Sequence, residues 1–168
     1  MLIDYLRPQL KYESLSKTIF IPMIIDSASI FLKEFKKLLA DSPKNNFPLL
    51  NIKNHPTALN SKKHIFFIKK LEKIMSTYAD RFSENSPNQN ISIFFGVTAA
   101  ILESLEKKIS VIHVCSDPLF QSYNPQIWSS FIVKKLNESV FSYKLSALGK
   151  NINFVEKKTL HQVLKSYI

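Results

Sequence analysis

Glycine and cysteine are scarce in this chain, and their scarcity excludes several kinds of site. Gly96 and Gly149 are the only glycines among 168 residues, whereas Walker and GxGxxG turns need several residues without a Cβ. Cys115 is the only cysteine, so no internal disulfide can form. The histidines show no HExxH spacing, and no G-x-S-x-G elbow occurs. The sequence therefore predicts no metal site, no cofactor and no serine-hydrolase nucleophile.

Long apolar runs are also missing. The longest, residues 19–25, contains Pro22 and is far shorter than the ~20 residues that cross a bilayer. The first residues do not resemble a signal peptide, which has a basic stretch followed by an apolar core. We therefore expect a cytoplasmic protein, with peripheral contact to the inner face of the membrane as an alternative.

Positive charge is in excess, but arginine is rare. The formal net charge is +10, which favours partners that carry phosphate, such as nucleotides, nucleic acid or acidic lipid. Arg7 and Arg81 are the only arginines, and base reading depends largely on arginine, so we expect no specific recognition of nucleic acid. The lysines are dispersed along the chain, and an A/T-rich coding sequence is an equally simple explanation for many of them.

The composition is that of a single globular domain. Apolar residues make up 45% of the chain and charged residues 21%, which argues against a disordered or fibrous protein. Residues 1–17 show no sustained period and are interpreted as a lead-in segment, and residues 18–168 as one domain. A polar stretch over 83–90 divides this domain into two halves.

Strand and helix patterns alternate along residues 18–168. The patterns predict strands over 18–25, 47–53, 91–95, 110–115, 130–136 and 152–155, and helices over 27–40, from 61 to beyond Met75, and over 97–108, 138–148 and 159–167. Parallel neighbours need helical crossovers. We therefore predict an α/β protein with a Rossmann-like open sheet that is mostly parallel and has helices on both faces.

Ligands of such sheets bind beyond the carboxyl ends of the strands, and an unusual peptide follows the second predicted strand there. Lys53 and His55, with Pro56 behind them, would offer two donors to a phosphate or carboxylate. The alternative is an ordinary surface loop in which His55 hydrogen-bonds to its neighbours.

A second peptide joins the strand over 91–95 to a helix. Gly96 and Thr98 would leave backbone N–H groups and a hydroxyl open to an anion, and Glu103 would accept hydrogen bonds from a sugar diol. The alternative is a common strand-to-helix junction with Glu103 on a solvated helix face. A third peptide, Ser116-Asp117, follows the next strand and reads equally well as a turn opener. His113, within that strand, is more often a hydrogen-bonded core residue than a ligand.

The order and spacing of these peptides resemble the C-terminal, donor-nucleotide half of GT-B glycosyltransferases, especially bacterial surface-polysaccharide and sialyltransferase-like enzymes. Those families show a Lys-x-His-Pro signature, which here reads Lys53-Asn54-His55-Pro56. They also show a turn with a hydroxyl residue into a helix with a glutamate five residues later, which here is Gly96-Val97-Thr98 through Glu103. The resemblance covers roughly residues 18 to 118.

The resemblance implies a nucleotide-sugar site, with CMP or UDP as the nucleotide. It implies that Lys53 and His55 contact the phosphate or nucleotide, that Thr98 and the amides after Gly96 contact the phosphates, and that Glu103 contacts the ribose. A GT-B enzyme has two such halves, and the acceptor and usually the catalytic base belong to the other one. We therefore assign no catalytic residue and expect a separate acceptor-domain chain as a partner. The alternative function is a non-catalytic interaction module that binds a partner protein or an acidic membrane surface.

Overall fold

A six-stranded mixed sheet forms the centre of the protein in the computed structural model, which describes residues 15–25, 27–58, 61–96, 98, 100–115 and 131–145. The strands are β1 (Thr18–Phe20), β2 (Asn51–Lys53), β3 (Ile91–Phe95), β4 (Ser110–Val114), β5 (Phe131–Asn137) and β6 (Val140–Leu145), in the order β2-β1-β3-β4-β6-β5. Strands β2, β1, β3 and β4 are parallel to one another, β6 runs antiparallel to β4, and β5 runs antiparallel to β6. The predicted α/β class with a mostly parallel open sheet is therefore confirmed.

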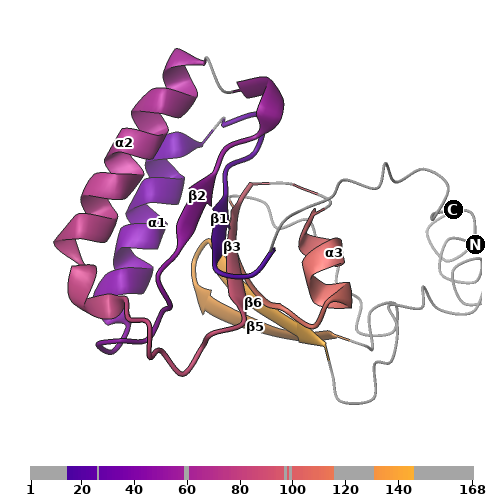
Figure 1. The fold of residues 1–168 in the computed structure, drawn as a ribbon. Helices are drawn as coiled ribbons and strands as arrows, with labels where there is room; N and C mark the ends of the chain where they lie inside the picture. The colour runs from indigo at the N-terminus through magenta and orange to yellow at the C-terminus, as the bar shows by residue number, and fades with distance from the viewer. Residues whose placement is uncertain are drawn as a thin grey trace, which may run out of the picture.

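Helices cover both faces of this sheet (Figure 1). Helices α1 (Ala28–Asp41) and α2 (Lys62–Thr77) lie side by side on one face, and α3 (Ala100–Glu106) lies on the other. Short 3-10 turns follow β2 and α2, at Pro56–Ala58 and Ala79–Arg81. None of the helices in the described ranges is long and apolar enough to cross a membrane.

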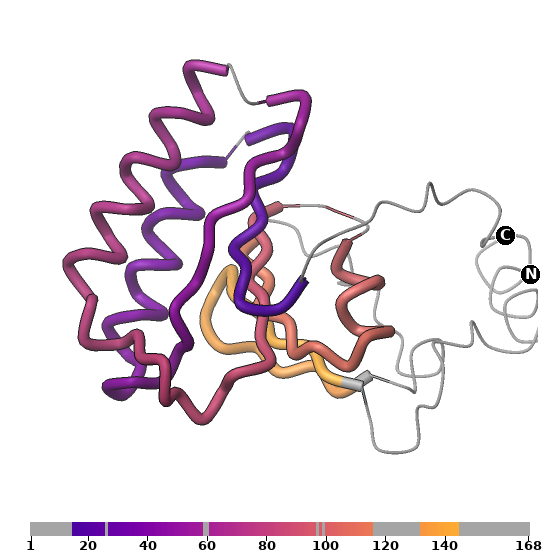
Figure 2. The backbone as a smooth tube through the Cα atoms, viewed as in Figure 1, coloured from indigo at the N-terminus to yellow at the C-terminus, as the bar shows by residue number. Residues whose placement is uncertain are grey.

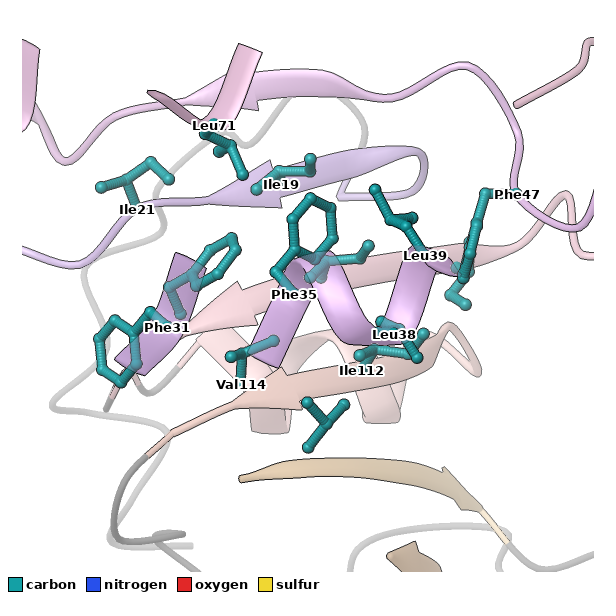
Figure 3. Packing of buried hydrophobic residues seen from close by; sticks show 14 of the residues in the cluster. Ile19, Ile21, Phe31, Phe35, Leu38, Leu39, Phe47, Leu71, Ile112 and Val114 are labelled. Carbon is teal, nitrogen blue, oxygen red and sulfur yellow. The ribbon is translucent and has the colours of Figure 1, made fainter. Parts of the chain in front are cut away.

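The main core lies between the sheet and the pair α1 and α2 (Figure 3). Helix α1 presents Phe31 and Phe35, one turn apart, and both rings pack on Phe95 of β3, with centroids 6.1 and 5.5 Å away. Phe67 of α2 meets the same ring edge-on at 5.3 Å. Phe95 therefore joins both helices to the sheet, and the period of 3.6 in the two helical segments is what brings their apolar sides onto it.

A second, smaller core lies between the sheet and α3. Phe20 and Phe94 occupy paired positions on β1 and β3, and their rings stack with centroids 4.6 Å apart. Ile101 and Leu105, one turn apart on α3, are fully buried in the same cluster as Tyr143 of β6. Alternate residues of each strand thus serve opposite cores, because successive side chains of a strand point to opposite faces.

The connections across the sheet have opposite hands. The chain passes from β1 through α1 to β2, and then returns through α2 past β1 to β3 (Figure 2). Because both helices lie on one face while the strand order reverses, one crossover is right-handed and the other is left-handed. A doubly wound Rossmann sheet changes face where the order reverses, whereas here the change of face comes one element later, at α3.

Prolines end or delay two of the predicted strands. The strand predicted over 18–25 ends at Phe20, because Pro22 has no N–H to donate to the ladder. The strand predicted over 47–53 pairs as a strand only from Asn51, and Phe47 instead makes an isolated bridge to Phe82. The helix predicted over 97–108 is shorter and spans Ala100–Glu106.

The helix predicted over 138–148 is wrong for the described residues, which form β6. Val140 is buried on the α1 side, whereas Phe141 and Tyr143 pack on the α3 side. This alternation has the period of two of a strand, and it places aromatic residues where they pair with β4 and β5. The strand predicted over 130–136 is present as β5, and it does lie at the end of the sheet order. The strand predicted over 152–155 and the helix over 159–167 fall outside the described residues.

Candidate functional site

The carboxyl ends of the parallel strands meet at one edge of the sheet. In the register, Phe20 at the end of β1 lies beside Lys53 on one side and Phe94 on the other. Lys53 and the turn at Gly96 are therefore separated by one strand, a lateral distance of about 10 Å at the usual strand spacing. The structure thus places the first two predicted peptides at the same edge.

The connections that follow two neighbouring strands split at this edge, although the strands themselves stay paired. After β1 the chain turns to the face that carries α1, and after the adjacent β3 it turns to the face that carries α3. Neighbouring strands whose connections leave to opposite faces define the usual ligand crevice of an open α/β sheet. This switch point lies between the loop at Pro22 and the turn at Gly96, which approach each other closely.

Pro22 lies against Gly96 where the connections split. Gly96 has a φ of +64°, and a Cβ added there would lie 3.2 Å from Cγ of Pro22 and 3.7 Å from the Phe31 ring. The turn thus needs glycine both for its left-handed backbone and for the close approach of the proline. Met23 and Ile24, next in the loop, are 52% and 59% exposed. The loop therefore presents apolar surface at this edge of the sheet.

Lys53 is the last residue of β2, and His55 lies in the loop that follows it. The His55 ring is half-buried and its Nδ1 lies 2.8 Å from Oγ1 of Thr57. Asn54 supports the loop by accepting a hydrogen bond from the His55 N–H and donating one to the carbonyl of Ala58. This pattern matches the alternative reading of a histidine that bonds to its neighbours, and it also fixes the ring with Nε2 directed away from Thr57.

Thr98 and Glu103 are both engaged within the segment that leads into α3. Oγ1 of Thr98 accepts a hydrogen bond from the N–H of Ala100 at 3.3 Å, so the hydroxyl caps the start of the helix. The Glu103 carboxylate accepts one from Nζ of Lys107 at 2.9 Å. Thr98 lies at the edge of the sheet, before α3 begins, whereas Glu103 lies within the helix. The predicted Ser116 and Asp117 fall outside the described residues.

His113 belongs to the core, as the simpler sequence reading held. It is fully buried, its Nε2 donates to the Gly96 carbonyl at 2.7 Å, and its Nδ1 lies 3.1 Å from the Tyr143 hydroxyl. Burial lowers the pKa of the imidazole to about 4, against the smaller opposing effect of the bond to Gly96. The neutral ring therefore accepts a hydrogen bond at Nδ1 from the Tyr143 hydroxyl. The pKa of that hydroxyl is raised, chiefly by burial.

Sequence reasoning missed His64, which lies beneath the same edge. The residue is 5% exposed in the first turn of α2, and its Nε2 donates to the Pro22 carbonyl at 2.9 Å. Its buried Nδ1 has no hydrogen-bond partner within the described part of the chain. The spacing of His64, Phe67 and Leu71 along one helix side was the available signal that the imidazole faces inward.

The edge offers cationic and hydroxyl groups rather than metal ligands. Among the described residues, no three His, Cys, Asp or Glu side chains gather closely enough to hold a metal ion. Two cavities formed by described residues lie elsewhere, one between α1 and α2 and one between the end of α1 and the β5–β6 hairpin. Fold and edge together define an α/β protein with an open mixed sheet and a split at β1 and β3. In comparisons with family models, curated proteins and solved structures, none matches this chain.

Proposed function

We propose that this chain is a nucleotide-sugar-binding domain of the kind that forms the donor half of a GT-B glycosyltransferase. The observation that carries the proposal is the placement of Lys53, His55 and Thr98 at one sheet edge, on the two sides of the split between β1 and β3. Such an edge is where open α/β sheets bind nucleotides. The net charge of +10 favours an anionic ligand.

The groups at the edge have distinct roles in this proposal. The Lys53 ammonium and Nε2 of His55 contact phosphate oxygens, and the Thr98 hydroxyl donates to the same group while its oxygen still caps α3. The exposed side chains of Met23 and Ile24 provide apolar surface on which a base or sugar ring packs.

Glu103 must exchange its partner to bind a ribose. The ion pair with Lys107 is an i,i+4 pair with half-exposed side chains, and such pairs contribute only about 0.5 kcal/mol. The hydrogen bonds of a ribose diol offset that loss, so Glu103 selects nucleotides over free phosphate. Glycosyl transfer itself depends on placing an acceptor and stabilising the departing phosphate, and in this proposal a separate acceptor-binding chain supplies the acceptor and the catalytic base.

Titration calorimetry with CMP, UDP, GDP and pyrophosphate tests the proposal. We expect at least one nucleotide to bind, with affinity reduced about tenfold by Lys53→Met or by His55→Ala, as for the loss of one charge-assisted hydrogen bond. Thr98→Val should weaken binding, and Thr98→Ser should restore it because the hydroxyl returns. Glu103→Gln should weaken nucleotide binding and leave pyrophosphate binding unchanged.

Lys44→Met is the matched control, because Lys44 lies in the turn after α1, on the way back to the start of β2 at the opposite edge of the sheet. Equal loss of affinity in Lys44→Met and Lys53→Met would mean that net charge, not the site, holds the ligand. No heat of binding with any of the four compounds at millimolar concentration would refute the proposal.

A further inference from the structure

A groove with lysines on both walls runs between α1 and α2. Its volume is about 550 Å³, and it lies over helix positions other than the fully buried ones. Lys33 and Lys36 form the α1 wall, and Lys70 and Lys73 form the α2 wall. Among the residues that line it, none is acidic. The groove is therefore a concentrated site of positive charge.

The floor of the groove is apolar and recessed. Leu32, Ile74 and Tyr78 line it and are half-buried, whereas the four lysines are exposed. Phe66 continues the same side of α2 by one turn, is 60% exposed, and lies 4.3 Å beneath Nζ of Lys70. An apolar floor between two rows of ammonium groups matches an occupant that has an apolar ridge with acidic groups on both sides.

The four lysines have no anionic partner in the described part of the chain. The ion pairs there join Lys44, Arg81, Lys107 and Lys135 to acidic residues, and none involves a lysine of the groove. Four like charges around one groove repel one another. An anionic occupant removes this repulsion and also covers the floor.

The shape of the groove separates two classes of anionic partner. A flat bilayer would meet the protruding lysines first and leave the recessed floor uncovered, because lipid head groups pair with the ammonium groups at the rim and do not reach the floor. A helix presents a narrow ridge that reaches such a floor. The groove extends at least from Ser29 to Lys36, about 10 Å at 1.5 Å per residue, which matches side chains at positions i, i+4 and i+7.

We propose that this groove binds an acidic amphipathic helix of a partner protein. The apolar ridge of that helix lies on Leu32, Ile74 and Tyr78, and its carboxylates pair with the lysines of both walls. The surface lies on the outer side of α1 and α2, and the proposal is independent of the nucleotide site at the sheet edge.

A designed peptide is the probe for this proposal. It has four helical turns, leucine at i, i+4, i+7 and i+11, glutamate at the flanking positions and a fluorescent label. A second peptide of the same composition has its leucines distributed around the helix, so that it keeps the charge and lacks the ridge. Fluorescence anisotropy with the full chain measures the affinity of both.

Two pairs of variants test the location. Lys33→Glu with Lys73→Glu should weaken binding of the ridged peptide at least about tenfold, and Lys37→Glu with Lys69→Glu, the same charge change on exposed positions of the same helices outside the groove, should weaken it far less. Thr77→Trp fills the groove and should abolish binding, whereas Ser76→Trp, its neighbour outside the groove, should not. Thermal melts confirm that each variant folds.

The proposal is overturned if the ridged and redistributed peptides bind equally, if both double charge reversals have the same effect, or if neither peptide binds at millimolar concentration. Vesicles of phosphatidylcholine with and without phosphatidylserine decide the membrane alternative. Groove-dependent binding to the anionic vesicles, without binding of the ridged peptide, would assign this surface to lipid and would also refute the proposal.

Discussion

The imidazole of His113 in β4 donates a hydrogen bond from Nε2 to the carbonyl of Gly96, at 2.7 Å. This bond fixes the turn that follows β3 to the neighbouring strand, from the side of the sheet that carries α3. Because Gly96 in turn lies against Pro22, one buried ring supports the geometry of the split edge. A residue that sequence analysis treats as ordinary core therefore positions the candidate site without lying in it.

The burial of His113 predicts a loss of stability in mild acid. Its pKa is about 4 in the folded protein and 6.5 in the unfolded chain, so between these values the unfolded chain binds a proton that the folded protein does not. The free energy of unfolding should therefore be at its full value above pH 6.5 and fall as the pH drops toward 4, by up to about 3 kcal/mol. Urea unfolding at a series of pH values measures this.

His113→Gln is the variant that isolates this effect. We expect it to be less stable at pH 7, because the bonds to Gly96 and Tyr143 are altered, but to lose stability less steeply between pH 6.5 and 4. The carboxyl groups titrate in both proteins, so the difference between the two curves reports on His113. Parallel curves would show that this histidine does not titrate as its burial implies.

Alanine at Gly96 should destabilise the protein by about 2 kcal/mol. A left-handed backbone costs a residue with a Cβ about 1 kcal/mol, and the added methyl would lie 3.2 Å from Cγ of Pro22. Chemical denaturation measures the change. The double variant Gly96→Ala with Pro22→Ala should recover only the steric part, so a coupling energy near zero would contradict the contact between these residues.

Glycine at Lys108 should stabilise the protein by up to about 1 kcal/mol. Lys108 has a φ of +58° and follows α3, where its N–H donates to the Leu105 carbonyl and the N–H of Ile109 donates to that of Ser104. This pair of hydrogen bonds is typical of a helix C-terminus whose next residue has a left-handed backbone, a position that Lys108 occupies and that favours glycine. A rise in the urea midpoint is the expected result, Lys107→Gly one residue earlier should lower it, and the reverse order would contradict the assignment of this helix end.

The strengths and failures of the sequence predictions have separate physical causes. Helices α1 and α2 were predicted from their apolar period, because packing on a sheet requires one apolar side whatever the partner is. Helix α3 was predicted too long, since Thr98 caps it from within the predicted range. The helix predicted over 138–148 is wrong for Val140–Leu145, because Val140, Phe141 and Tyr143 favour a strand and pairing with β4 and β5 stabilises it.

For the candidate site, the sequence predicted which residues follow the strands but not what those residues contact. Lys53 and Thr98 come to one edge because the strands before them are parallel, which the strand and helix order already implied. That His55 contacts Thr57, and that Glu103 pairs with Lys107, depends on loop and helix geometry that no periodicity encodes. The importance of His64 likewise depended on the position of Pro22, far from it in the chain.

The sequence by itself determined the α/β class, the scarcity of glycine turns and the positive charge, because composition and local periods suffice for these. Tertiary structure decided the rest: which face each helix covers, where the sheet splits, and how lysines from two separate helices come to line one groove. Those features depend on contacts between distant segments, and the free energy of such contacts is set by packing that appears only when the whole sheet forms.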